Sequence, residues 1–185
     1  MRRFIIIKYT VLLMLSLMGV DAHAGERLER TGFWGAIGLG AGYVQQSFEG
    51  FEETGTQFFL GFEGGYTINI HFLLGLELSG WLLQSDDIAY KTKGEGISQV
   101  FLITRYYPSK DSGLFAKAGG GYVSHWRNRL GETERLSGWG LTVGAGYDFS
   151  MSKKWALTPF LTYCAGETEN QDYNAFTFGI GFTFQ

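Results

Sequence analysis

The sequence predicts a closed eight-stranded antiparallel up-and-down transmembrane β-barrel that follows a signal peptide. Three observations lead to this all-β fold class. Bulky apolar residues alternate with small or polar residues, the bulky face is nearly free of charge, and short connections alternate with longer, more polar ones. The composition agrees, because 28 Gly and only 2 Pro accompany 16 Phe, 10 Tyr and 5 Trp, and the glycines lie within the alternating segments.

The N-terminal region has the three parts of an export signal. Arg2 and Arg3 are followed by an apolar run over residues 11–20 and by the small-residue site Ala22-His23-Ala24, which predicts cleavage after Ala24. The run is shorter than the roughly 20 residues of a membrane-spanning helix, so an uncleaved anchor is the less favoured alternative. The predicted divisions are a signal peptide at 1–24, a periplasmic N-terminal lead at 25–31 and an outer-membrane β-barrel at 32–185.

Charge and cysteine content exclude several classes of protein. Acidic residues outnumber basic ones by 18 to 15, and the signal peptide removes more basic than acidic residues, so clustered cations for nucleic acid are lacking. Cys164 is the only cysteine, which rules out an intramolecular disulfide. We find no Cys/His cluster with metal-site spacing and no phosphate-binding loop, so we expect neither a metal nor another cofactor.

The eight strands are recognised in order from the bulky residues that recur at every second position. Each strand has about 10 to 14 residues, enough for the 9–11 that a tilted membrane strand needs. The fourth is the least regular, because Phe101 and Ile103 fall on its polar side. The bulky faces are Phe33, Ile37, Leu39 and Tyr43; Phe58, Leu60, Phe62, Tyr66 and Ile68; Phe72, Leu74, Leu76, Leu78 and Leu82; Val100, Leu102 and Tyr106; Leu114, Ala118, Tyr122 and Trp126; Trp139, Leu141, Val143, Tyr147 and Phe149; Trp155, Leu157, Leu161 and Tyr163; Phe176, Phe178, Ile180, Phe182 and Phe184.

The connections give the predicted topology. Short turns at one end and long loops at the other are typical of outer-membrane barrels, in which the short turns and both termini are periplasmic. The short connections lie at 69–71, 108–113 and 150–154, and the long ones at about 45–55, 84–96, 127–135 and 166–173.

The composition of the two faces decides which one meets lipid. A soluble barrel would expose Lys, Glu and Asp on its outer face, whereas the polar face here is mostly Gly, Thr, Ser and Ala, which suits a crowded interior. Tyr and Trp also gather near both ends of the strands, as interfacial anchors do. We therefore predict that the bulky face meets lipid, and a soluble ligand-carrying barrel is the alternative.

Five charged residues have inward parity: Glu63, Glu77, Arg105, Lys117 and Asp148. The first four lie at similar distances from the short turns. Turn symmetry places Glu63 opposite Glu77 and Arg105 opposite Lys117 on adjacent strands. Buried charges persist only when they are paired, so we predict one neutral network that plugs the lumen. Interior filling is the favoured interpretation, because eight strands enclose little more than side chains, and a gate or ion path is the alternative.

A hydrolytic site is not supported by the sequence. Only His125 lies near the long-loop end, and its neighbour Ser124 has opposite parity, so the two cannot form a nucleophile–base pair. We interpret Cys164 as a small inward-facing filler. The long loops, which mix acidic and aromatic residues, are the remaining place for an extracellular protein partner.

The C-terminal run Gly179-Ile180-Gly181-Phe182-Thr183-Phe184 and the repeated glycine–aromatic alternation resemble small outer-membrane β-barrel domain proteins of the OmpA/OmpX-like porin superfamily, over residues 32–185. In such proteins Gly179, Phe182 and Phe184 would belong to the signal read by the barrel-assembly machinery; Gln185 departs from it, because such chains usually end on the aromatic residue. The resemblance implies the cell outer membrane, with its lipid and lipopolysaccharide as surroundings. We expect a structural or surface-interaction role through extracellular loops with a plugged lumen. A narrow passive channel is the alternative, and a lipid-modifying enzyme is less favoured.

Overall fold

The protein is a β-barrel, seen in a computed structural model that describes residues 29–48, 51–83, 92–129, 132–168 and 171–185. The predicted signal peptide, its cleavage site and most of the N-terminal lead lie outside the described residues. In the part described, no helix is long and apolar enough to cross a lipid bilayer. The strands are β1 (Phe33–Phe48), β2 (Phe51–Asn69), β3 (Phe72–Leu83), β4 (Thr92–Tyr106), β5 (Leu114–Arg129), β6 (Glu132–Tyr147), β7 (Phe149–Ser150), β8 (Trp155–Thr168) and β9 (Gln171–Phe184).

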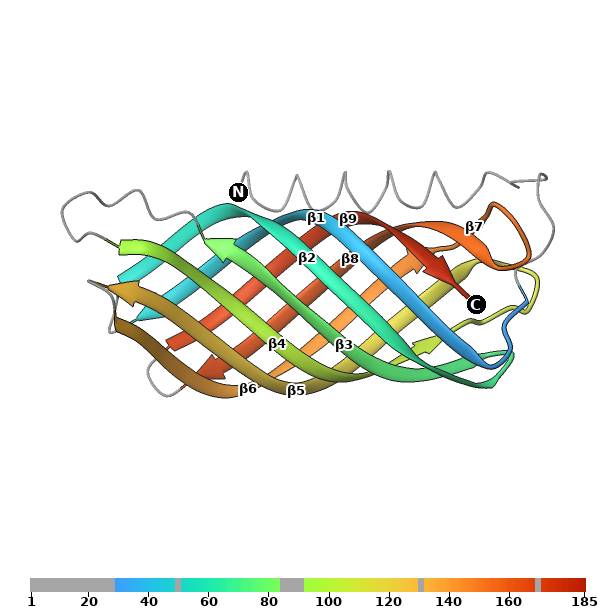
Figure 1. Cartoon of the computed structure of the whole chain (residues 1–185), viewed down its shortest axis with the longest axis horizontal. Helices are drawn as coiled ribbons and strands as arrows, with labels where there is room; N and C mark the ends of the chain where they lie inside the picture. The colour runs from blue at the N-terminus through green and yellow to red at the C-terminus, as the bar shows by residue number, and fades with distance from the viewer. Residues whose placement is uncertain (1–28, 49–50, 84–91, 130–131, 169–170) are drawn as a thin grey trace, which may run out of the picture.

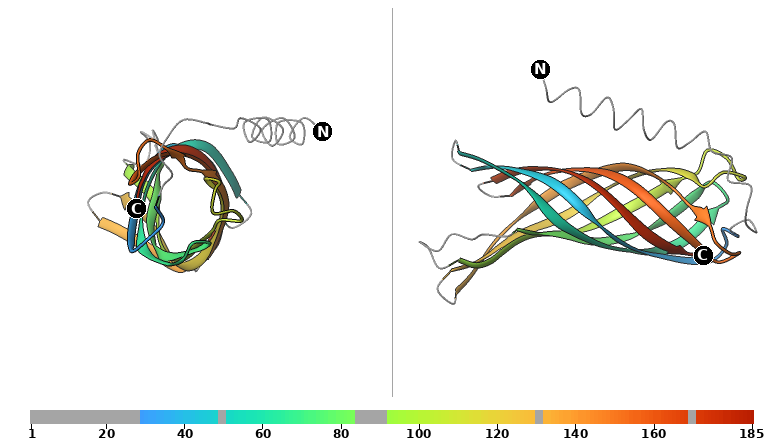
Figure 2. Two further views of the ribbon diagram at one scale, coloured as in Figure 1. Left: turned by 90° about the vertical axis from the view of Figure 1, so that its right-hand side faces the viewer. Right: turned by 90° about the horizontal axis from the view of Figure 1, so that it is seen from above.

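All described strands form one antiparallel sheet that closes on itself (Figures 1 and 2). Neighbours in the chain pair with one another, β1 pairs with β9, and β6 pairs with β8. The short strand β7 continues β6 after an interruption at Asp148 and pairs with the start of β8. Counting β6 and β7 as one strand, the described residues form a closed eight-stranded barrel, and the predicted fold class is confirmed.

The two faces of the sheet are as predicted. Bulky residues at alternate positions point outward and are exposed, with Phe33 and Trp139 as the extremes at 79% and 74%. Residues of opposite parity are buried inside the barrel, among them Phe101 and Ile103, whose parity conflicted with their apolar character. Most inward residues are small, so the barrel has room for the large side chains of Phe101 and Ile103, which form part of its packed core.

The strands are longer than predicted, and all four expected long connections are at least partly strand, including 84–96, since β4 begins at Thr92. β1 reaches Phe48 and β2 begins at Phe51, so most of 45–55 is paired strand. The same holds for 127–135 and 166–173, where the strands end at Arg129 and Thr168. These extensions have polar residues on their outward positions, so they lose the apolar alternation although their ladders of backbone hydrogen bonds continue. Alternation therefore measured only the apolar band, not the full strand length.

The opposite end of the barrel, called here the turn end, carries short connections, the first described residue, Glu29, and the C-terminus (Figure 1). In the first turn the Asn69 side chain accepts hydrogen bonds from the backbone N–H groups of His71 and Phe72, at 2.9 and 3.0 Å. Gly32, with φ +74°, directs the chain into β1 in a conformation that L side chains rarely adopt. The backbone N–H groups of Glu29 and Gln185 donate to the carbonyl oxygens of Lys153 and Lys154, which ties the segment before β1 and the C-terminus to the last turn.

Candidate functional site in the barrel lumen

The four charged residues predicted to form a network come from four consecutive strands. Glu63 on β2 lies directly opposite Glu77 on β3, and Arg105 on β4 lies directly opposite Lys117 on β5. Each pair places like charges side by side, which is unfavourable unless the opposite charges are within reach. The register therefore requires contact between the two pairs.

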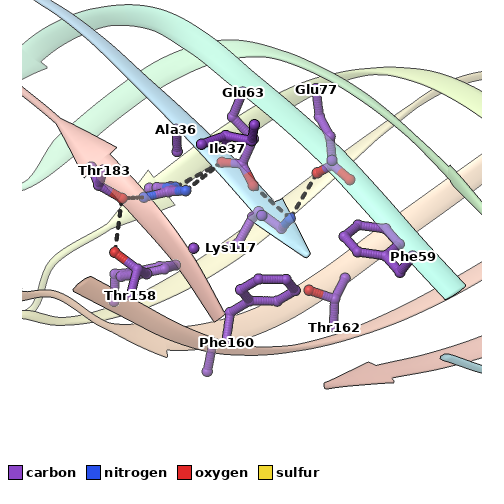
Figure 3. A pocket seen from close by; sticks show the side chains of 16 residues that line it. Ala36, Ile37, Phe59, Glu63, Glu77, Lys117, Thr158, Phe160, Thr162 and Thr183 are labelled. Atoms are coloured by element: carbon purple, nitrogen blue, oxygen red, sulfur yellow. Dashed lines mark hydrogen bonds and ion pairs between the residues drawn. The ribbon is translucent and has the colours of Figure 1, made fainter. Parts of the chain in front are cut away.

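The structure brings all four side chains together (Figure 3). The Arg105 guanidinium approaches Glu63 at 2.7–2.8 Å through Nη2 and Nε. Lys117 Nζ bridges the two acids, at 3.0 Å from Glu63 and 2.7 Å from Glu77. The side chains of Arg105, Lys117 and Glu77 are nearly inaccessible, and that of Glu63 is 13% exposed. The cluster has zero net charge, and its cations and anions satisfy one another out of water.

Hydrogen bonds extend from the cluster towards the turn end. Arg105 Nη1 donates to Thr183 Oγ1 at 3.4 Å, and the hydroxyls of Thr183 and Thr158 are 2.9 Å apart. Asp148, a fifth interior charge, accepts hydrogen bonds from Thr158 at 2.6 Å and from the Tyr107 hydroxyl at 2.7 Å. Tyr107 lies just beyond β4, and burial together with the neighbouring Asp148 raises its pKa above the ordinary value, so it stays a hydrogen-bond donor.

A second set of bonds extends in the other direction. Ser79 donates to Glu77 at 2.6 Å and accepts from Gln99 Nε2 at 2.7 Å. Gln99 in turn accepts a hydrogen bond from Tyr173 at 3.2 Å, and Cys164 donates to Thr142 at 3.3 Å beside it. Cys164 is 1% exposed and so occupies the inward filler position predicted for it.

Aromatic rings pack around the charges. Arg105 lies over the rings of Trp34 and Phe115, with its guanidinium carbon 4.8 and 4.5 Å from their centroids. Phe59 packs against Phe160 with ring centroids 5.9 Å apart, and both rings lie beside the cluster in Figure 3. The space left open to the centres of water molecules is about 20 Å³, enough for roughly one water. The middle of the lumen is therefore filled.

The described part of the N-terminal lead contacts the turn end through Arg30. Arg30 donates from Nη2 to the carbonyl oxygen of Ser112 at 2.6 Å, and its guanidinium lies 3.8 Å from the centroid of the Tyr107 ring. Weaker bonds at 3.4–3.5 Å join Nη1 to the carbonyl oxygens of Lys110 and Ser109. Arg30 thus ties the end of the lead to the turn between β4 and β5.

At the opposite end, His125 is buried and its Nε2 lies 2.7 Å from Glu95 Oε1. Ser124 has the opposite parity, and its backbone carbonyl oxygen accepts a hydrogen bond from the Ser98 hydroxyl at 3.4 Å. The described residues show no hydrogen bond between the side chains of Ser124 and His125, and they include no group of three or more His, Cys, Asp or Glu that could hold a metal ion. The structure therefore does not assemble a nucleophile–base pair at these two residues.

Sequence reasoning missed several members of the lumen. The sequence pattern predicts a loop at Glu95 and gives no site role to Trp34, Tyr107 or Arg30. Parity would have identified two of them, because Trp34 shares the inward positions of its strand and Tyr107 follows Arg105 by two residues. Arg30 has no such signal, because it precedes the first strand.

The residues of the expected assembly signal lie on β9. Phe182 and Phe184 point outward and are 48% and 39% exposed, whereas Gly179 faces inward against the backbone of Leu39 and the Phe160 ring. Gln185 extends the strand by a backbone hydrogen bond to Lys154, and its buried side-chain amide has no partner in the described structure.

Comparison with known proteins identifies the type of barrel. A family model described as "Outer membrane protein beta-barrel domain" matches residues 10–184. Neisserial surface protein A from Neisseria is similar in structure, with a TM-score of 0.60 and 14% identity over 83% of this chain and 97% of that one. Ail, the attachment invasion locus protein of Yersinia pestis, has a TM-score of 0.54 and 15% identity over 83% of this chain and 99% of that one. No curated protein sequence matches the chain.

Proposed function

The chain belongs to the outer membrane protein beta-barrel domain family, and from this membership we propose that it is a plugged barrel with a structural or surface-interaction role. Membership of the family places it in the outer membrane. The proposal includes export with cleavage after Ala24, insertion by the barrel-assembly machinery, and outer-membrane lipid and lipopolysaccharide around the apolar band. The turn end is then periplasmic, and the opposite end, where the longer strand extensions lie, is extracellular, as in barrels of this class.

The filled lumen is the observation that carries the proposal. Glu63, Glu77, Arg105 and Lys117 cross the barrel as one linked cluster, and aromatic rings occupy the space beside it. In the pocket beside the cluster, about 20 Å³ is open to the centres of water molecules, which is room for roughly one water and too little for a solvated solute. A filled lumen supports a role for the outer surface and the extracellular end.

The extracellular end offers such a surface. Beyond Tyr43, Trp139 and Phe176 the strands continue, but their outward residues change from apolar to polar, as at Ser47 and Asp172. Paired strands that leave the apolar band present a fixed surface in water. The names of two similar structures refer to a surface protein and to attachment and invasion, which is consistent with such a role.

Planar-bilayer recording tests the plug. We expect purified wild-type barrel to insert without conductance steps. A variant in which Glu63, Glu77, Arg105 and Lys117 are all replaced by Ser keeps the net charge and removes the cluster, so it should produce steps. Its folding is checked first by the mobility of unboiled and boiled samples on a denaturing gel. Conductance steps from the wild-type protein would contradict the proposal and support the narrow passive channel.

A lipid-modifying enzyme is the remaining alternative. Ser124 and His125 point to opposite faces of β5, so the geometry favours a non-enzymatic role. The test incubates the purified barrel with labelled phospholipid or lipopolysaccharide. If the wild type releases fatty acid and His125→Ala does not, this part of the proposal is overturned.

A further inference from the structure

Buried polar side-chain atoms without a hydrogen-bond partner gather at the turn end of the barrel. Among the described residues there are five such nitrogen and oxygen atoms, and they belong to four residues, all at this end. They are Arg30 Nε, Trp34 Nε1, Thr67 Oγ1 and both polar atoms of the Gln185 amide. The four residues are only 4–9% exposed. Because buried polar groups are normally paired, a cluster of unpaired ones at a single end needs a physical cause.

Three of these residues lie on neighbouring strands. Trp34 is near the start of β1, Thr67 is near the end of β2, and Gln185 directly follows β9. In the sheet β9 pairs with β1 and β1 pairs with β2, and the three residues have the inward parity of their strands. The β1–β9 register, extended by one position, places Trp34 opposite Gln185. The unpaired atoms therefore share one part of the turn end.

The segment before β1, residues 29–31, runs past these strands and is called here the strap. At its start the Glu29 N–H donates to the carbonyl oxygen of Lys153, in the turn between β7 and β8, at 3.0 Å. At its end the carbonyl oxygen of Gly32 accepts the Thr67 N–H at 2.8 Å. The strap thus connects the β8 side of the barrel to β2, with β9 and β1 between them. Figure 1 shows the blue start of the described chain at the same end as β7.

The strap itself is held by few contacts. Arg30 makes one short hydrogen bond, to the carbonyl oxygen of Ser112 at 2.6 Å, and its other two are 3.4–3.5 Å long. Its guanidinium also lies over the Tyr107 ring. Gly32, with φ +74° and open space where a Cβ would lie, separates the strap from β1 and can act as a hinge.

The docked strap combines gains and costs of similar size. Hydrogen bonds from a charged guanidinium stabilise it, whereas each buried donor or acceptor without a partner costs about as much as one hydrogen bond gains, or more. Lifting the strap would let water reach the unpaired atoms and would remove that cost. Two arrangements that are close in free energy are both populated.

We propose that the strap is a reversible lid at the turn end, which lifts about Gly32 and lets water reach the side chains of Trp34, Thr67 and Gln185. Water then stops at the Trp34 ring, which lies against Arg105 of the plug. The ion pairs of the plug do not involve the strap, so the lumen stays closed in both states. This inference goes beyond the proposed surface role and adds a moving part at the opposite end.

Exchange of side-chain protons with water tests the lid. It is measured by NMR on the full barrel in lipid nanodiscs. We expect the Trp34 indole proton and the Gln185 amide protons to exchange faster than the indole proton of Trp81, which donates to Thr177 inside the lumen at 3.0 Å. Arg30→Gln should speed the first two about tenfold, because the docked state loses a charged hydrogen bond, and should leave the third unchanged.

A reversible crosslink supplies the matched control. Glu29→Cys and Lys153→Cys, in a Cys164→Ala background, place a disulfide where a backbone hydrogen bond joins the strap to the turn. In the oxidised protein both fast exchange rates should fall to that of the Trp81 indole, and reduction should restore them. Arg135→Gln changes an exposed arginine at the opposite end and should leave every rate as in the wild type.

Two backbone amides separate lifting of the strap from fraying of the whole end. The N–H groups of Glu29 and Gln185 donate to the adjacent carbonyl oxygens of Lys153 and Lys154. Lifting of the strap should speed the exchange of the Glu29 amide and leave the Gln185 amide protected. Fraying of the whole end would expose both.

Three results would overturn the inference: a Trp34 indole that exchanges as slowly as that of Trp81 in the wild type and in Arg30→Gln, fast exchange that persists in the oxidised crosslinked protein, or equal exchange of the Glu29 and Gln185 backbone amides. Bilayer recording separates the lid from the plug. Arg30→Gln should give no conductance steps, and steps from this variant alone would make the strap part of the plug and overturn the inference. Steps from the wild type would contradict the plugged barrel and leave the exchange results standing.

Discussion

Replacing Arg105 with Met should destabilise the barrel strongly. The methionine keeps an apolar stem between the rings of Trp34 and Phe115, but it removes the bonds of 2.7 and 2.8 Å to Glu63 and the bond to Thr183. Glu63 then keeps only Lys117, which it shares with Glu77. Removing one partner from a buried ionic cluster costs about 3–5 kcal/mol, and we expect a loss of that size in the free energy of unfolding.

Urea unfolding of the barrel in lipid vesicles, followed by tryptophan fluorescence and by gel mobility, measures this loss. The double variant Arg105→Met with Glu63→Gln removes the unpaired charge, so it should be more stable than the sum of the two single changes predicts, with a coupling of about 1–3 kcal/mol. Arg135→Met removes an exposed arginine at the rim and should change stability by less than about 0.5 kcal/mol.

The cluster would not be a coupled network if Arg105→Met unfolded within about 0.5 kcal/mol of the wild type, or if the two single changes were additive. Either result would mean that water or lipid headgroups reach Glu63 and replace the guanidinium. The lumen would then be more open than the distances indicate.

Three further changes give expected outcomes at other points of the barrel. Tyr107→Phe deletes the buried hydrogen bond to Asp148, and urea unfolding should show a loss of about 1–3 kcal/mol. Gly65→Ala places a methyl group against the backbone of β3 and should reduce the folded fraction seen by gel shift. Gly64→Ala is the control and should fold normally, because its new methyl group would lie 3.7 Å from the nearest atom. Equal folded yields of the two variants would contradict the close approach of β3 to Gly65. Phe184→Ala should lower the amount of barrel in the outer membrane of expressing cells while sparing secretion, and unchanged amounts would remove this residue from the assembly signal.

Much of the fold follows from parity because each strand has one apolar and one small or polar face. Period-two alternation located every membrane-spanning strand, and turn symmetry placed Glu63 opposite Glu77 and Arg105 opposite Lys117. Eight strands leave so little room that inward charges on neighbouring strands must meet. For these residues, strand position alone determines the contact.

The extracellular end could not be read in the same way. Above the apolar band both faces of a strand can meet water, so alternation disappears while backbone pairing continues, and 127–135 resembles a loop although it is mostly strand. The pair His125–Glu95 was missed for this reason, since Glu95 lies in a segment without alternation. Arg30 was missed because its contacts depend on how the lead folds across the turn end, which no period records.

The direct test of the closed membrane barrel compares unboiled and boiled samples of the outer-membrane fraction on a denaturing gel. The β6–β8 pairing closes the sheet and the apolar band faces lipid, so the protein should be in the membrane fraction and run faster until it is boiled. A protein in the soluble periplasmic fraction, with one mobility before and after boiling, would contradict the account, because it would place the bulky face against something other than lipid.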